Sequence, residues 1–76
     1  MKTEYLVHVL NQAESDSIYH YETLHEAVHK ILHAREQGDS ASFIAVKEEG
    51  LPRWPTLEEM NEFKEILSRV SIERKL

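Results

Sequence analysis

The sequence contains no cysteine, which excludes disulfide bonds, thiolate metal ligands and a cysteine nucleophile. Small secreted scaffolds usually rely on disulfides, so their absence favours a reducing compartment, and we expect the protein in the cytoplasm. Glycine is also scarce, because Gly38 and Gly50 are the only two, and no glycine-rich phosphate-binding loop can be formed from them. No serine or threonine lies in a nucleophile-elbow context. We expect neither enzymatic activity nor a cofactor.

Long apolar segments are missing as well. Nothing approaches the roughly 20 consecutive apolar residues that span a bilayer. The apolar run near the N-terminus is interrupted by His8 and is too short and too polar for a signal-peptide core. Nine basic residues against fourteen acidic ones give a formal net charge of -5. Because this charge opposes attraction to phosphate backbones and anionic lipids, we expect neither direct nucleic-acid binding nor membrane association.

The remaining composition is that of a globular protein. Apolar residues make up 41% and charged residues 30%, a balance far from that of disordered chains. At 76 residues we expect one domain, residues 1–76, with one small core. So small a core gains stability from a partner or from a second copy, which makes self-association an expectation from size alone. Small acidic proteins are common among bacterial and phage accessory genes, but this assigns no site.

Three runs rich in β-branched and aromatic residues predict strands at residues 4–10, 17–21 and 42–47. The polar segment 11–16 separates the first two strands and predicts an antiparallel hairpin. Pro52 and Pro55 exclude a central strand, because each proline fixes its own φ and restricts the residue before it. We therefore predict an extended loop over residues 48–55.

Two segments match the capping box that begins a helix: Thr23-Leu24-His25-Glu26 and Thr56-Leu57-Glu58-Glu59. In this motif the threonine hydroxyl accepts from the glutamate N–H, and the glutamate carboxylate accepts from the threonine N–H. Apolar residues at spacings of three and four follow each box, and Gly38 supplies a stop after the first. We predict helices over residues 24–37 and 57–72.

The resulting order ββαβα predicts an α+β fold. A lone hairpin cannot shelter two amphipathic helices, so we expect a two-layer sandwich of a three-stranded mixed or antiparallel sheet with both helices on one face. The connection through the first helix allows the third strand to lie beside the second or beyond the first. The sequence leaves this strand order open.

Three histidines, His25, His29 and His33, follow one another at intervals of four along the first predicted helix. Imidazoles at i and i+4 can bind Zn²⁺, Ni²⁺ or Cu²⁺, and residues 25–29 satisfy the HExxH spacing of zinc proteases. However, Glu26 is assigned to the helix cap, and the series turns away from the apolar stripe towards solvent. We therefore expect at most weak transition-metal binding and no physiological metal site.

A row of glutamates, Glu58, Glu62 and Glu65, marks one side of the second predicted helix. Such a row can imitate phosphates, which suggests an acidic inhibitor or nucleic-acid mimic that blocks a basic site on a partner protein. The alternative is an ordinary solvated helix face, since glutamates favour the first turn and Glu65 can pair with Arg69. We favour the solvated face.

Trp54 lies between Arg53 and Pro55 in the predicted loop. A tryptophan held by prolines can anchor a protein interface. Its large ring can equally pack under the second helix, which we favour because of the apolar area that this buries. The two interpretations differ in whether the ring is exposed.

Both faces of the predicted sheet carry apolar side chains. Strict alternation divides the first strand into Tyr5, Val7 and Val9 against Leu6 and Leu10, and the third into Phe43 and Ala45 against Ile44 and Val46. Two helices cover only one face, so the other exposes apolar groups unless a partner covers it. Our leading hypothesis is a non-enzymatic protein-protein interaction or regulatory module, homodimeric, that uses an apolar sheet face or edge with Leu6, Leu10 and Trp54.

Overall fold

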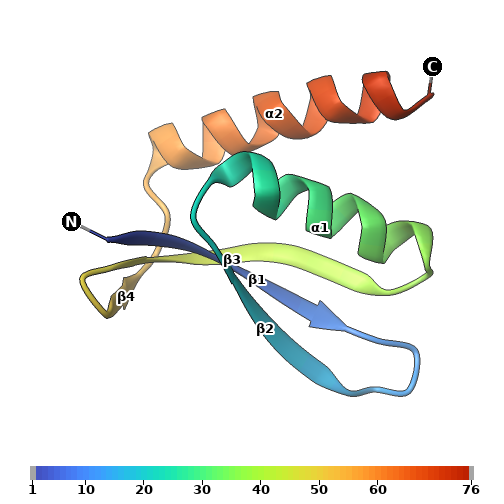
Figure 1. Cartoon of the computed structure of the whole chain (residues 1–76), viewed down its shortest axis with the longest axis horizontal. Coiled ribbons are helices and arrows are strands. Elements are labelled where there is room, and N and C mark those ends of the chain that lie inside the picture. The colour runs from blue at the N-terminus through green and yellow to red at the C-terminus, as the bar shows by residue number, and fades with distance from the viewer. Residues whose placement is uncertain (1, 76) are drawn as a thin grey trace.

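The computed structural model describes residues 2–75, which form two helices and four strands (Figure 1). In chain order the elements are β1 (Thr3–Leu10), β2 (Asp16–Tyr21), α1 (Leu24–Glu36), β3 (Ser40–Glu48), β4 (Leu51–Arg53) and α2 (Leu57–Lys75). The α+β class is confirmed. The prediction of three strands in the order ββαβα is wrong, because a short fourth strand follows the third.

The sheet is antiparallel throughout, with the strand order β2-β1-β3-β4. β1 and β2 form the predicted hairpin, whose loop is closed by the Asn11 N–H donating to the Ser15 carbonyl at 3.1 Å. After α1 the chain returns on the other side of β1. The third strand therefore lies beyond the first, which is one of the two arrangements that the sequence left open.

β4 lies in the segment 48–55 that we predicted to be a loop. It is joined to β3 by a two-residue turn at Glu49 and Gly50, whose positive φ angles of 50° and 85° belong to a tight hairpin turn. Pro52 pairs with Lys47 at the outer edge of the sheet. Proline is tolerated there because its missing N–H faces away from the neighbouring strand. The prolines thus exclude only a central strand.

Both helices begin at the predicted threonines. At α2 the capping box is reciprocal: the Glu59 N–H donates to Thr56 Oγ1 at 3.2 Å, and the Thr56 N–H donates to Glu59 Oε1 at 2.8 Å. At α1 the Glu26 N–H donates to Thr23 Oγ1, but the Glu26 carboxylate accepts from the Thr23 hydroxyl and not from its N–H. α2 continues three residues beyond its predicted end at residue 72.

α1 ends where Gly38 was expected to stop it. The Asp39 N–H donates to the Ala34 carbonyl at 3.0 Å, and Gly38 adopts φ +88°, a left-handed conformation that glycine favours. A Cβ at Gly38 would overlap the side chain of Gln12, whose Nε2 donates to the Gln37 carbonyl. The turn after α1 is therefore closed against the β1–β2 loop.

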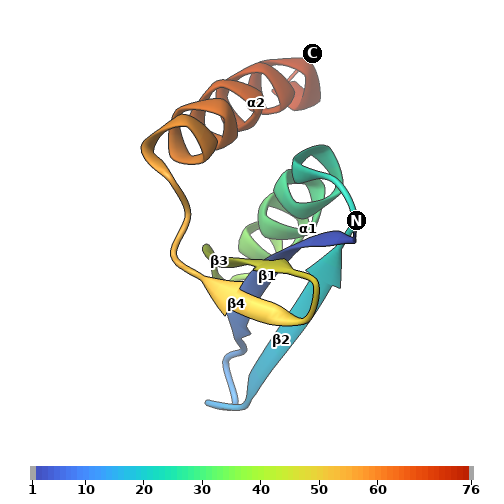
Figure 2. The ribbon, with the colours of Figure 1, turned by 90° about the vertical axis from the view of Figure 1, so that its left-hand side faces the viewer.

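The two helices lie on the same side of the sheet, as predicted, but at different heights. Figure 2 shows the sheet below, α1 above it and α2 farthest from the strands. α2 packs mainly on α1 and reaches the sheet through Phe63, whose ring centroid lies 5.1 Å from that of Phe43. The core is therefore centred between α1, β1 and β3. Its large, fully buried side chains are Val7, Val28, Ile31, Val46 and Val70.

Candidate protein-binding surface

The face of the sheet turned away from the helices is open. Val7 stands opposite Tyr19 and Phe43 in the two ladders, and directly opposed residues share a face. Val7 and Phe43 belong to the core beneath the helices, so the alternate residues of each strand point to the other face, which we call the open face. Its apolar side chains, the open-face patch, are Leu6, Leu10, Ile18, Ala45, Pro52 and Trp54.

Trp54 is the most exposed large apolar residue, with 84% of its surface accessible. Our favoured interpretation, packing under the second helix, is therefore wrong. The preceding Arg53 pairs with buried Val46 on the helix side, which places Trp54 on the open face. A pocket of about 290 Å³ adjoins the ring and is lined by Ala45, Pro52, Arg53 and Trp54. An exposed tryptophan beside an apolar hollow is typical of an interface anchor.

The predicted alternation along β3 is also wrong. Phe43 and Val46 both belong to the core, although they are three residues apart. The pairing register shifts between Leu6 and Val7, so that β3 contains one extra residue, Ile44, in a β-bulge. The bulge moves Val46 from the open face, where alternation put it, to the helix side.

The members of the patch on β1 and β2 differ in accessibility. Leu6 lies on the open face as predicted, but it is only 8% exposed, and it stands between His20 and Ala45 in the two ladders of the inner strand β1. Leu10 is half-buried. Ile18 of β2 is 54% exposed and was not singled out from the sequence, although its place between Ser17 and Tyr19 in an alternating strand could have indicated it. Ile18 and Trp54 therefore offer the most apolar area to a partner.

Polar pairs lie beside the apolar groups on the open face. His8 Nε2 lies 3.1 Å from Asp16 Oδ1, and His20 Nδ1 lies 3.4 Å from Glu4 Oε2. Each pair connects β1 to β2. In the β1–β2 ladder His8 stands opposite Ile18 and His20 stands opposite Leu6, so the two histidines do not face each other. His8 lies between Leu6 and Leu10 on this face, so polar and apolar groups are interspersed, and protein-protein interfaces contain both.

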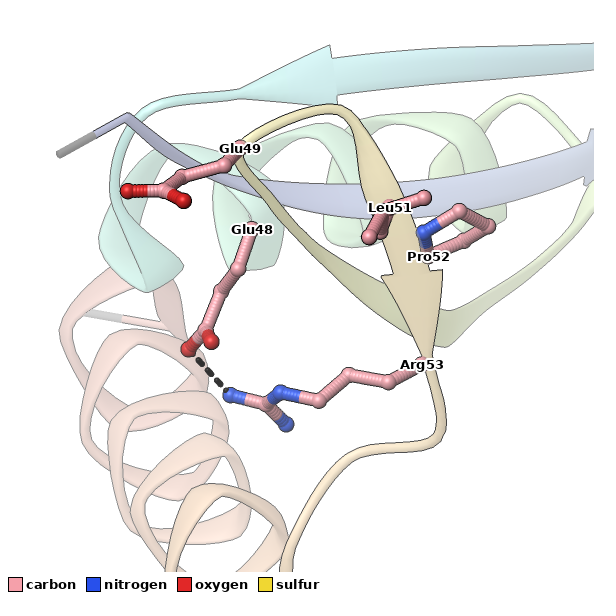
Figure 3. A pocket seen from close by; sticks show the side chains of 5 residues that line it. All are labelled: Glu48, Glu49, Leu51, Pro52 and Arg53. Carbon is pink, nitrogen blue, oxygen red and sulfur yellow. Dashed lines mark hydrogen bonds and ion pairs between the residues drawn. The ribbon is translucent and has the colours of Figure 1, made fainter.

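On the helix side, Arg53 connects β4 to the start of α2. Its guanidinium donates to both carboxylate oxygens of Glu59, at 2.7 and 2.9 Å, and to Glu48 Oε1 at 2.7 Å. Figure 3 shows the Glu48 and Arg53 side chains pointing towards each other beside a pocket of about 330 Å³. The bonds from Arg53 lower the pKa of Glu59 from 4.5 to about 2. Because the guanidinium is so fully engaged, we assign it a structural role.

The three glutamates of the predicted acidic row, Glu58, Glu62 and Glu65, are all exposed on α2. Glu65 accepts from Arg69 at 3.3 Å, as the spacing indicated. Burial raises the pKa of Tyr5, and the negative charges of Glu59 and Glu62 raise it further. The row lies on the helix side of the molecule, so the structure does not bring it together with Trp54, Leu6 or Leu10.

The three histidines of α1, His25, His29 and His33, are exposed, and the rings of His25 and His29 lie 4.9 Å apart. Glu26, the acidic residue of the HExxH spacing, is bonded to Thr23 at the helix cap. Among residues 2–75, no group of three or more His, Cys, Asp or Glu side chains is placed to hold a metal ion. The structure thus brings the rings of His25 and His29 together, and among residues 2–75 it places no third metal-ligating side chain beside them.

No family model matches the chain, and neither a curated protein nor a solved structure is similar to it. Neither of the two helices in residues 2–75 is long and apolar enough to cross a membrane.

Proposed function

We propose that the protein is a non-enzymatic protein-protein interaction module that binds its partner with the open-face patch. The observation that carries this proposal is the exposure of Trp54 and Ile18 on the face that both helices leave uncovered. Burial of apolar area is the main driving force of protein association, and tryptophan is among the residues that contribute most at interfaces.

The chemistry of the surface favours a protein as the ligand. The hollow beside Trp54 accepts an apolar side chain, while the His8–Asp16 and His20–Glu4 pairs offer polar contacts on the β1–β2 side of the open face. The net charge of -5 opposes nucleic acid. The lack of cysteine supports a cytoplasmic location for this interaction.

Trp54 is the only tryptophan, so its fluorescence reports on the patch directly. We expect a partner isolated from the native host and purified to shift the emission to the blue and to protect the ring from acrylamide. Trp54→Ala should weaken binding at least tenfold, measured by calorimetry. The matched control is Leu57→Ala, an exposed apolar residue on the helix side, which should bind like the wild type. A complex that leaves Trp54 fully quenchable contradicts the proposal.

The second candidate is an acidic inhibitor that uses Glu58, Glu62 and Glu65, and the exposure of all three side chains supports it. Charge reversal separates the two candidates. The combined variant Glu58→Lys, Glu62→Lys should retain a partner that binds the open-face patch and should lose one that binds the acidic row. The Trp54→Ala variant should give the opposite pattern: it should lose a partner that binds the open-face patch and should retain one that binds the acidic row.

A further inference from the structure

The outer edge of β2 lacks the proline, lysine and β-bulge that commonly protect an edge strand from pairing with another molecule. Within residues 2–75, β2 has a neighbour on one side only, and every residue from Asp16 to His20 is exposed. Its six residues include no proline and no lysine, and its ladder with β1 contains no register shift. Natural sheets protect their edges with short strands, proline, lysine or bulges. β2 is therefore open to strand addition.

The hairpin geometry shows which backbone groups this edge presents. Asn11 and Ser15 form a hydrogen-bonded pair at the loop, and bonded pairs alternate with non-bonded pairs along an antiparallel ladder. Ser17, Tyr19 and Tyr21 are therefore bonded to β1. The N–H and C=O groups directed outwards belong to the alternate residues, Asp16, Ile18 and His20.

We propose that two copies of this chain pair through their β2 strands, antiparallel, with the two-fold axis at Ile18. In this register Ile18 stands opposite Ile18 of the second copy, and His20 stands opposite Asp16 of the second copy on each side. All three outward-directed residues of each strand then stand opposite outward-directed residues of the other strand. Their N–H and C=O groups can therefore form all the hydrogen bonds of an antiparallel ladder. The two four-stranded sheets become one continuous sheet.

The charges of the strand select this register over its neighbour. Opposed residues must share a face, so the axis can lie on a residue, such as Ile18 or its neighbour Tyr19, but not between two residues. An axis on Tyr19 would place Asp16 opposite Glu22 of the second copy, and like charges directly opposed are destabilising. An axis on Ile18 avoids that repulsion, because it places the imidazole of His20 opposite the carboxylate of Asp16 of the second copy.

This pairing goes beyond the proposed function and does not depend on it. The helices of both copies lie on one side of the joined sheet, and the two open faces form one surface with Ile18 at its centre. Trp54 lies beyond β4, at the opposite edge of each sheet, and stays exposed in the dimer. Its fluorescence therefore distinguishes pairing of the edges from stacking of the open faces.

Sedimentation equilibrium over the micromolar range tests the pairing. We expect the wild type to approach twice the monomer mass of 8.9 kDa with no change in Trp54 emission. Ile18→Lys, which opposes two lysines at the axis, should sediment as a monomer. The matched control Leu51→Lys alters an apolar residue of the other edge, 73% exposed, and should remain a dimer.

Ile18→Pro provides a second variant should Ile18→Lys fail to fold by circular dichroism. It removes only an outward-directed N–H, so the β1–β2 ladder is retained while the pairing is lost. A wild type that stays monomeric overturns the proposal, as does a dimer that survives both Ile18 variants. A dimer whose Trp54 emission shifts to the blue also overturns it, because the open faces then meet instead of the edges.

Discussion

The two edges of the sheet are built differently. The β4 edge has three residues, one of them Pro52, and Arg53 binds it to Glu48 and to Glu59 of α2. The β2 edge has six residues, five of them exposed, and no proline. The β4 edge is thus protected from pairing with another strand by its short length and its proline, and the β2 edge has neither. Because both edges belong to the same small sheet, small size alone does not account for the open edge.

The helices reinforce this asymmetry. α1 lies over β1, β2 and β3, whereas α2 is linked to β4 by the Arg53–Glu59 bond and reaches the sheet through the contact of Phe63 with Phe43. Polar contacts hold both ends of α2: Glu59 is bonded to Arg53 of β4, and Arg74 is bonded to Glu36 at the end of α1. Changes to these contacts should alter stability, and changes at the β2 edge should alter association.

The largest expected effect comes from the aromatic contact under α2. Phe63 is buried, and Phe63→Ala should cost about 3 to 5 kcal/mol of the free energy of unfolding, because it leaves a cavity next to Phe43. Urea denaturation measures this loss. Leu57→Ala, at an exposed position of the same helix, should stay within about 0.5 kcal/mol of the wild type. Equal losses in the two variants would mean that α2 is not anchored at Phe63.

A smaller and more local effect is expected at Arg53. Arg53→Gln leaves Glu48 and Glu59 without their shared cation, so the protected edge should open more often. Amide hydrogen exchange should become faster in β4 and in the first turn of α2, and should stay unchanged in β2. Arg69→Gln removes only the exposed pair with Glu65 and should change neither region. Uniformly faster exchange in Arg53→Gln would contradict a local role.

The pH dependence follows from Glu59. Its pKa is about 2 in the folded state, below the ordinary value of 4.5, so its contribution to stability is complete above pH 4.5 and is lost as the pH falls towards 2. Thermal melts in this range should show a steeper loss for the wild type than for Glu59→Gln. Glu58→Gln, one residue away, should melt like the wild type. A wild-type slope retained in Glu59→Gln would exclude Glu59 as the cause.

The smallest effect is expected at the histidines of α1, which face solvent away from both edges. Zn²⁺ stabilises a protein only when it binds the folded state, and the exposed His25 and His29 pair lacks further ligands in the described residues. Micromolar Zn²⁺ should leave the melting temperature of wild type and of His29→Gln unchanged. Submicromolar binding that His29→Gln abolishes would establish a metal site on α1.

Much of the fold could be predicted because its signals are local. The threonines at both helix starts and Gly38 after α1 act within one turn of chain, and each was found where the sequence indicated. β4 was missed because three residues around Pro52 become a strand only when β3 supplies a partner. The β-bulge at Ile44 has no local signal either, since it exists only relative to β1.

The candidate site was predicted less completely than the fold. An apolar set on the second face of β1 was visible from alternation, but alternation does not show that Leu6 is buried or that Trp54 projects from the sheet. These exposures depend on contacts between strands that are far apart in the sequence. Alternation could have placed Ile18 on one face of its strand, but only the strand order shows that this strand is an edge.

The most direct test of edge pairing is disulfide trapping, because the natural chain contains no cysteine. Opposed residues of a bonded pair have Cα atoms about 5.5 Å apart, within the range of roughly 4.4 to 6.8 Å that a disulfide requires. Ile18→Cys should therefore form a covalent dimer rapidly under mild oxidation, while Leu51→Cys, at the protected edge, should stay monomeric. Ile18→Cys cross-linking no faster than Leu51→Cys would contradict pairing of the β2 edges.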